Sequence, residues 1–387
     1  MNLQPGLIEI GELLKAEAIL AIQDGNHGEK HPKASDYVDE GISFVMANDL
    51  NRGILNPLET AKIPEGLAEK LRIGFSKSGD VLLTHKGTIG NTAIVPEVSP
   101  YVMLTPQVTY YRVNPDLLDN QYLMYCFRES GFRKVMASLA QQSTRPYIGI
   151  TAQRKLKIYY RGIDEQKELV RFIKAYDDLI ANNYRRVKLL DDTARILYKE
   201  WFVHLRFPGH EHVKIIDGAP ADWSIKKIGE ILTLNYGKAL KSDDRVDGDF
   251  PVYGSSGVVG THSKSLVSGP GIIVGRKGNV GSIHWSTKDY WPIDTVYFIS
   301  KEESDLYLYY ALQYVQFINT DVAVPGLNRD VAYGRTVLIP SSSILESFLN
   351  EIQPIRAQIE KLEELNAKLV AARDLLLPRL MNGDIAV

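Results

Sequence analysis

The 387-residue chain has one cysteine, Cys126, and no apolar run that approaches the length of a membrane span. A single cysteine cannot form an internal disulfide, which is typical of proteins from a reducing compartment. A membrane-spanning helix needs about 20 consecutive apolar residues, whereas the longest apolar run near the N-terminus covers only residues 18–22. No basic-then-apolar signal pattern precedes it. These absences predict a cytoplasmic protein that does not contact a membrane.

Several catalytic motifs are also missing. The chain has no Pro-Pro pair, which the Asp/Asn-Pro-Pro-aromatic motif of base-amine methyltransferases requires, and no Gly-Lys-Ser/Thr phosphate loop. The fragment Glu165-Gln166-Lys167, with Asp116 far upstream, resembles part of a nuclease site, but charged residues that open a helix usually just face solvent. His210-Glu211-His212 has metal-ligand side chains, yet a solvated connector explains it better. We therefore predict no catalytic residue and no metal site.

Acidic residues are absent from two long windows, although the formal net charge of the chain is −2. No acid lies between Glu129 and Asp164 or between Asp249 and Asp289. The first window holds seven basic residues and the second holds four: Arg133, Lys134, Arg145, Arg154, Lys155, Lys157, Arg161, Lys264, Arg276, Lys277 and Lys288. Chance and a solvated face are the alternative explanation. Two such windows favour a basic surface that is used twice.

The chain repeats itself in loosened form. Residues 10–14 (Ile-Gly-Glu-Leu-Leu) return as residues 228–232 (Ile-Gly-Glu-Ile-Leu), and residues 85–90 (His-Lys-Gly-Thr-Ile-Gly) return as residues 276–281 (Arg-Lys-Gly-Asn-Val-Gly). The offset falls from 218 to 191, 185 and 178 along the chain, so the order is kept while loop lengths differ. The extra residues of the first copy are expected within residues 26–72. A duplicated globular unit suits a target with two similar places, such as a DNA duplex.

Each copy is predicted to be an α+β domain followed by a long helix. Short β-type runs (residues 80–84, 93–96, 108–113, 271–274, 282–285 and 295–299) are joined by Gly, Pro and Asn, and residues 119–140 and 304–319 have helical patterns. Beyond them, apolar residues alternate at spacings of four and three, which predicts a coiled coil. The first seam is Leu169, Ile173, Tyr176, Ile180, Asn183, Val187, Leu190, Ala194, Leu197 and Trp201, and the second is Ile352, Ile355, Ile359, Leu362, Asn366, Leu369, Arg373 and Leu376.

The seam asparagines Asn183 and Asn366 are predicted to set the register of this coil. In an antiparallel pair that aligns them, facing residue numbers sum to 549, and apolar residues meet at most layers. Pro354 and Pro378 are expected to kink or end the second helix. The alternative is two unrelated amphipathic helices, each packed on its own domain.

Two glycine-containing loops are the candidate ligand-binding elements. Glycine permits a tight turn and close approach of a ligand, and the accompanying side chains suit phosphates and base edges in DNA. The candidates in these loops are Thr84, His85, Lys86, Thr88, Asn91, Arg276, Lys277 and Asn279. A third element, residues 144–148 in the first copy and 325–329 in the second, adds Arg145, Tyr147, Asn328 and Arg329. A plain hairpin and a structural loop are the alternatives.

Several segments follow a pattern known from one family. They are residues 164–170 (Asp-Glu-Gln-Lys-Glu-Leu-Val), 197–202 (Leu-Tyr-Lys-Glu-Trp-Phe), 206–211 (Arg-Phe-Pro-Gly-His-Glu), 223–231, 250–260 and 375–385. On these segments the chain resembles the specificity subunits of type I restriction–modification systems over nearly its full length. Residues 341–346 depart from the pattern because they lack the Glu-Gln pair that opens the first helix.

The resemblance implies two similar α+β target-recognition domains separated by two long helices that form an antiparallel coiled coil. Residues 1–160 would form the first recognition domain, 161–206 the first conserved helix, 207–340 the connector and second recognition domain, and 341–387 the second conserved helix.

It also implies a non-catalytic subunit of a restriction endonuclease and adenine-N6 methyltransferase complex. Such a subunit reads a bipartite, asymmetric target in double-stranded DNA and recruits two methylation subunits and restriction subunits. S-adenosylmethionine, ATP and Mg are expected on those partners, and no cofactor on this chain. A self-sufficient DNA-modifying enzyme and a coiled-coil scaffold without DNA binding are the alternatives.

Overall fold

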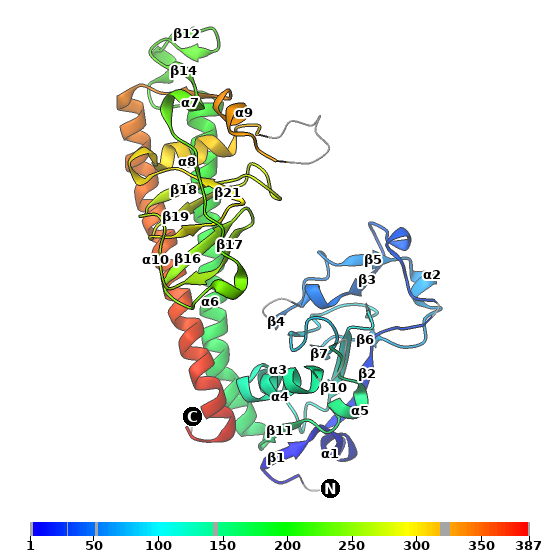
Figure 1. The fold of residues 1–387 in the computed structure, drawn as a ribbon. Coiled ribbons are helices and arrows are strands. Elements are labelled where there is room, and N and C mark those ends of the chain that lie inside the picture. The colour runs from blue at the N-terminus through cyan, green and yellow to red at the C-terminus, as the bar shows by residue number, and fades with distance from the viewer. Residues whose placement is uncertain (1–2, 29, 51–52, 142–145, 318–325, 386–387) are drawn as a thin grey trace. The chain divides into compact units, whose positions relative to one another are not determined.

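The computed structural model describes residues 3–28, 30–50, 53–141, 146–317 and 326–385, and it divides into two compact units (Figure 1). Unit 1 is Met1–Ala181 with Asn366–Val387, and unit 2 is Asn182–Leu365. Two long helices, α6 (Ile163–Tyr198) and α10 (Ser342–Asn382), each contribute a portion to both units. Each unit therefore consists of one globular domain and a stretch of both helices.

Unit 1 is built on two mixed sheets. Its strands are β1 (Gly6–Glu9), β2 (Ile19–Asp24), β3 (Ile42–Val45), β4 (Gly53–Ile54), β5 (Ala61–Ile63), β6 (Phe75–Ser76), β7 (Val81–Thr84), β8 (Thr92–Ile94), β9 (Val102–Leu104), β10 (Val108–Val113) and β11 (Lys157–Tyr160). One sheet has the order β2-β10-β7-β8-β4, the other β5-β3-β9-β6, and β1 pairs with β11. The shorter helices are α1 (Ile10–Lys15), α2 (Glu65–Ala68), α3 (Asn120–Arg128), α4 (Ser130–Gln141) and α5 (Ile150–Gln153).

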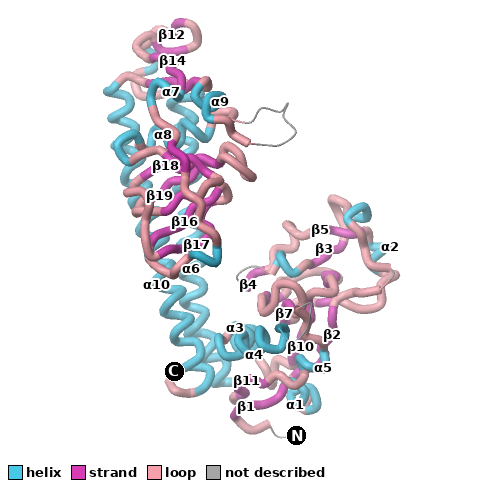
Figure 2. Tube along the Cα trace, in the orientation of Figure 1, coloured by secondary structure: helices cyan, strands magenta, loops and turns pink. Residues whose placement is uncertain are grey.

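Unit 2 repeats this plan with fewer residues. Its strands are β12 (Ile215–Ile216), β13 (Ala219–Pro220), β14 (Ser224–Lys227), β15 (Asn235–Tyr236), β16 (Phe250–Gly254), β17 (Gly257–His262), β18 (Gly271–Gly275), β19 (Ile283–Ser286), β20 (Trp291–Pro292), β21 (Val296–Phe298) and β22 (Thr336–Ile339). Its short helices are α7 (Ile228–Ile231), α8 (Leu306–Gln313) and α9 (Arg329–Tyr333). In Figure 2 the strands β16, β17, β18 and β19 of this unit lie along its stretch of α6 and α10.

The sheet topology confirms the duplication. The order β15-β21-β18-β19 in unit 2 matches β2-β10-β7-β8 in unit 1, and the β14–β22 pair matches β1–β11. The elements α7, α8 and α9 take the places of α1, α3 and α5 in chain order. The extra residues of the first copy are part of the stretch between β2 and β7, which holds β3 to β6 and α2, whereas the stretch between β15 and β18 holds β16 and β17.

The seam positions of both long helices are buried or half-buried throughout, as the coiled-coil pattern predicts. Within unit 1 the helices run antiparallel, because Arg161 donates to the carbonyl oxygen of Met381 at 3.2 Å while Asn366 Nδ2 donates to the Ile180 carbonyl oxygen at 3.3 Å. Asn183 is also buried. That the two asparagines face each other stays a prediction.

The sequence predicts that Pro354 and Pro378 kink or end the second helix, and the predicted end is wrong, since α10 runs through both. A proline removes one backbone donor and so one intrahelical hydrogen bond. Buried neighbours on either side, Ile352 near the first proline and Leu377 and Leu380 near the second, hold the helix in place. Packing of these side chains outweighs the local cost of the proline.

Gln166, the glutamine of the Glu-Gln pair near the start of α6, has a structural role. Its side chain is fully buried, accepts from Asp119 N at 2.9 Å, and donates to the carbonyl oxygens of Arg161 and Leu117 at 2.7 and 3.1 Å. The helix start is thereby tied to the loop that precedes α3. In α10 the fourth residue is Leu345, which packs against the apolar core of unit 2 instead.

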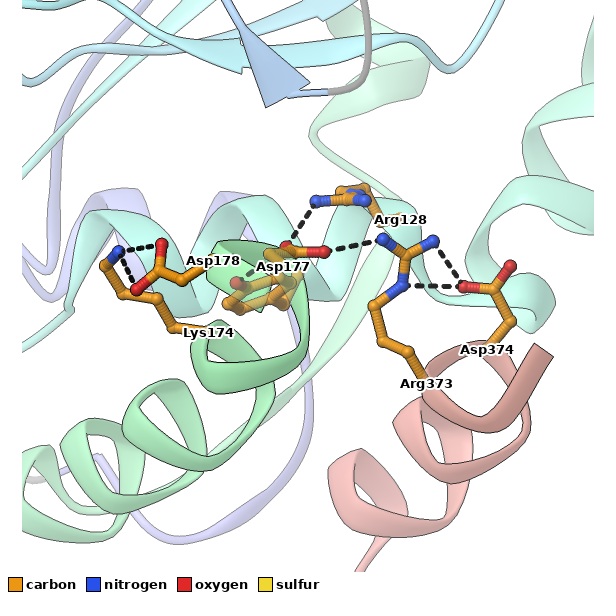
Figure 3. A network of polar contacts seen from close by, with 7 residues as sticks. Arg128, Lys174, Asp177, Asp178, Arg373 and Asp374 are labelled. Carbon is orange, nitrogen blue, oxygen red and sulfur yellow. Dashed lines mark hydrogen bonds and ion pairs between the residues drawn. The ribbon is translucent and has the colours of Figure 1, made fainter. Parts of the chain in front are cut away.

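Asp177 joins three helices of unit 1 (Figure 3). Its carboxylate accepts from Tyr125 OH at 2.9 Å and Arg128 Nη1 at 3.1 Å on α3, and from Arg373 Nη1 at 2.5 Å on α10. The guanidinium of Arg373 also pairs with Asp374. One carboxylate therefore attaches the globular domain of unit 1 to both long helices.

We expect Asp177→Ala to lower the free energy of unfolding by about 3 kcal/mol, because it leaves the largely buried Arg128 and the Tyr125 phenol without their acceptor and Arg373 with Asp374 alone. Asp178→Ala is the matched control, since it breaks only the exposed Lys174–Asp178 pair one residue away and costs about 0.5 kcal/mol or less. Urea unfolding of the full chain measures both. Equal midpoints for the two variants would contradict the role of Asp177.

Candidate nucleic-acid interface

The two glycine loops have the same backbone hydrogen bonds. Between β7 and β8, Thr84 N donates to the Asn91 carbonyl oxygen at 2.9 Å; between β18 and β19, Gly275 N donates to the Ser282 carbonyl oxygen at 2.7 Å. These pairs are related by an offset of 191, the one found for the sequence repeat. The predicted loops are therefore equivalent hairpin connections in the two units.

Glycine is required at two positions of each loop. Gly87 and Gly90 have φ of 76° and 87°, and Gly278 and Gly281 have φ of 78° and 77°. Residues with a Cβ rarely adopt this left-handed conformation. The spacing of the glycines thus specifies the shape of the loop, while the residues between them are free to differ.

The third predicted element lies beside the glycine loop in each unit. Lys86 forms a β-bridge with Tyr147, and Lys277 forms the equivalent bridge with Gly326. The bridges correct the sequence alignment by two residues, because Tyr147 matches Gly326 at an offset of 179 rather than 181. Arg329, which opens α9, consequently corresponds to Ile150 at the start of α5 and has no arginine counterpart there.

In unit 1 the candidate residues divide into exposed and buried ones. Lys86, Thr88 and Tyr147 are exposed and Asn91 is half-buried, whereas the side chains of Thr84 and His85 are buried. Thr84 Oγ1 accepts from Asn91 N at 2.9 Å and so holds the loop. Arg145 lies outside the described residues.

His85 belongs to a buried polar network beneath the loop. The Thr109 hydroxyl donates to Asp24 Oδ1 at 2.6 Å and accepts from Gln153 Nε2 at 3.0 Å, and His85 Nδ1 lies 2.7 Å from the same hydroxyl. Because the Thr109 hydrogen is directed to Asp24, His85 Nδ1 is the donor of this pair. Burial lowers the pKa of His85, against the opposing effect of Asp24. At neutral pH the ring is therefore neutral and is no cation for a phosphate.

In unit 2 the equivalent place is open to solvent. Arg276 and Arg329 are half-buried, and Lys277, Asn279 and Asn328 are exposed. Asn328 Oδ1 accepts from Asp330 N at 2.8 Å, which caps α9. A cavity of about 260 Å³ lies here, lined by Tyr236, Arg276, Tyr297, Leu327, Asn328, Arg329 and Asp330.

Cross-strand pairing identifies residues that the sequence repeat missed. Asp24 faces Thr109 across β2 and β10, as Tyr236 faces Tyr297 across β15 and β21. The positions of Asp24, Thr109 and His85 in unit 1 are thus occupied in unit 2 by Tyr236, Tyr297 and Arg276, respectively. The signal for these positions lies in strand pairing, which a comparison of short motifs does not contain.

Comparison with known proteins assigns the chain. A family model described as "Type I restriction modification DNA specificity domain" matches residues 10–189 and 220–330. The chain belongs to this family. Both glycine loops lie in the matched ranges, and the second range includes Asn328 and Arg329.

Individual members of the family are distant. The type I restriction enzyme MjaIX specificity subunit of Methanocaldococcus jannaschii is 20% identical over 402 residues, 92% of this chain and 89% of that protein. The MjaVIII specificity subunit of the same organism is 24% identical over 173 residues, 44% of this chain and 40% of that protein. The crystal structure of a type I restriction–modification S subunit from M. genitalium has a TM-score of 0.55 at 17% identity and covers 98% of this chain and 96% of its own. This likeness confirms the predicted fold class.

The His210–Glu211–His212 segment forms a short 3-10 turn in which His210 Nδ1 lies 2.9 Å from the Phe207 carbonyl oxygen. Among the described residues, no group of three or more His, Cys, Asp or Glu side chains is arranged to hold a metal ion. In the same part of the chain, no helix has the length and apolar character needed to cross a bilayer.

Proposed function

We propose that this chain is the non-catalytic specificity subunit of a type I restriction–modification complex and reads a bipartite, asymmetric DNA target, one half with each unit. The observation that carries the proposal is the same two-loop surface built twice with different side chains. Unit 1 exposes Lys86, Thr88 and Tyr147 there, and unit 2 exposes Lys277 and Asn279. Because the loops of the two units have the same backbone conformation, they can approach a duplex in the same way. Because their exposed side chains differ, the two units can recognise different base sequences.

The proposal assigns the chemistry of the complex to other subunits. Two methylation subunits would bring S-adenosylmethionine, and restriction subunits would bring ATP and Mg. The test is methylation of DNA by the chain alone and by the chain with its methylation subunit. We expect activity only in the second case, at a split target; turnover by the purified chain alone would contradict the proposal.

An exposed apolar stripe on α6 supports recruitment of a methylation subunit. In unit 2, Leu189 and Ile196 are spaced seven residues apart on α6 and are 66% and 61% exposed, while Ala194 and Tyr198 on another face pack into the core. Val203, which is 46% exposed, ends the π-helical turn Lys199–Val203 that follows α6. Residues seven apart lie on one side of a helix. We propose that a helix of the methylation subunit packs on this stripe.

The exposed lysines of the two loops give a test of DNA contact. We expect Lys86→Ala and Lys277→Ala each to weaken DNA binding by the assembled complex and to reduce the slope of log affinity against log salt by about one unit, because each removes one phosphate contact. Lys62→Ala is the control, at a half-buried lysine on β5 whose Nζ donates to the Asp39 carbonyl oxygen at 3.1 Å. If the salt dependence of binding were unchanged in both loop variants, these loops would not contact DNA.

A further inference from the structure

Two arginines of unit 2 lie against one tyrosine ring. The Cζ atom of Arg276 is 5.1 Å from the centroid of the Tyr236 ring, and the Cζ atom of Arg329 is 5.2 Å from it. Arg276 follows β18, Arg329 opens α9 and Tyr236 ends β15. Guanidinium groups at this distance are attracted to the electron-rich face of an aromatic ring. Tyr236 therefore brings two like charges from separate elements into one site.

Tyr236 is held in place by its contact with Tyr297. Its ring packs on the ring of Tyr297 with centroids 5.1 Å apart. Tyr297 is buried, and its hydroxyl donates to the Leu327 carbonyl oxygen at 3.0 Å. Arg276 is fixed independently, since its Nη1 donates to the Asp294 carbonyl oxygen at 2.7 Å. One nitrogen of Arg276 is thus used inside the protein, and the guanidinium keeps further donors for a ligand.

The cavity beside this cluster suits a base edge better than a phosphate. It has a volume of about 260 Å³, and Asp330 lines it together with both arginines. Among the described residues, no ion pair joins Asp330 to either arginine. A free carboxylate repels a phosphate, but it accepts from the N4 amino group of cytosine, while arginine donates to O6 and N7 of guanine. A G·C pair presents both patterns on one edge.

We propose that Tyr236 is a positioning residue that holds Arg276 and Arg329 as one guanine-recognising unit, with Asp330 accepting from the paired cytosine. The proposal rests on the proposed function, because it assumes that unit 2 reads one half of a DNA target. It goes further by naming one G·C position in that half. At the equivalent positions unit 1 has Asp24, Thr109, His85 and Ile150, so among the described residues the paired arginines are found in unit 2.

The test uses the full chain co-purified with its methylation subunit. Methylation mapping first gives the target of the unchanged complex. Binding of Arg276→Ala, Arg329→Ala, Tyr236→Leu and Tyr236→Phe complexes is then measured on that target and on duplexes with single base-pair changes in each half. Thermal unfolding shows that the variants are folded.

We expect Arg276→Ala, Arg329→Ala and Tyr236→Leu each to lower the preference for one and the same G·C pair about 10-fold or more. Tyr236→Phe should keep the preference, since the aromatic face is retained. Tyr236→Leu added to Arg329→Ala should cost little more than either change alone, because both act through one unit.

Three results would overturn the inference, and they differ from one another. Equal loss of affinity on every duplex, with a smaller salt slope, would identify a phosphate contact. Unchanged base preference in folded variants would make the cluster structural and leave the proposed function intact. An unchanged complex that recognises no split DNA target would remove the proposed function itself.

Discussion

Replacing residues 221–340 by the same region of a relative is expected to change one half of the recognised DNA target completely and to leave the other half as it was. The exchanged segment contains the glycine loop, the third element and the Tyr236 cluster of unit 2, and nothing of the unit 1 loops. Because each mismatched base pair costs about 1–3 kcal/mol, a changed half-site abolishes methylation of the original target. Methylation mapping measures the result.

The ends of the exchanged segment and its contacts with the long helices determine which donor sequences can replace it. Its two ends lie at β14 and β22, which pair with each other, so the pair is exchanged whole. The inserted domain packs on the helices through an aromatic cluster, in which Tyr307 meets Phe202 and Phe348. A donor with aromatic or large apolar residues at these contacts is therefore needed. The reciprocal control leaves residues 221–340 in place and replaces residues 1–160, which contain both unit 1 loops and the whole β1–β11 pair. Both halves changing together, or one continuous palindromic target, would contradict a split target.

The double variant Leu189→Glu with Ile196→Glu is expected to lower affinity for the methylation subunit about 100-fold or more. Each change removes a large apolar side chain worth about 1.5–3 kcal/mol when buried, and it would place a carboxylate against the partner. Both side chains are exposed in this chain, so the fold of unit 2 should be retained. Titration calorimetry with the isolated methylation subunit measures the loss.

Leu58→Glu is the control, because Leu58 is a leucine in the loop between β4 and β5 of unit 1 that is 82% exposed, more than Leu189. Loss of partner binding by this control as well would count against a specific stripe on α6. Deleting residues 346–380 would be a poorer experiment, since Phe348, Ile352, Leu362 and Leu377 are buried core residues and the chain would lose its fold along with its partner.

Local patterns in the sequence are sufficient for the duplication, the α+β class and the two long helices. The 4-3 spacing of apolar residues needs no knowledge of the partner helix, since a helix of 3.6 residues per turn places such residues on one side wherever it packs. The positions of Gly87, Gly90, Gly278 and Gly281 likewise follow from a local backbone requirement. For this reason the amino-acid sequence alone is enough to match the two loops with each other.

Tertiary structure decided what each residue faces. Thr84 and His85 belong to the same short motif as Lys86, yet the first two are buried and the third is exposed, because β7 is covered on both faces. Continuation of α10 through Pro354 likewise depends on core packing around Ile352 and not on the propensity of proline.

The Tyr236 cluster is the clearest case of a site that only the fold assembles. Tyr236, Arg276 and Arg329 are far apart in the chain and share no motif. The antiparallel pairing of β15 with β21 and of β21 with β18 brings Tyr236 beside Arg276, and the bridge between Lys277 and Gly326 brings the start of α9 to the same place. A linear pattern records the spacing of residues along one strand or helix, whereas hydrogen-bonded register between strands determines which side chains meet across them.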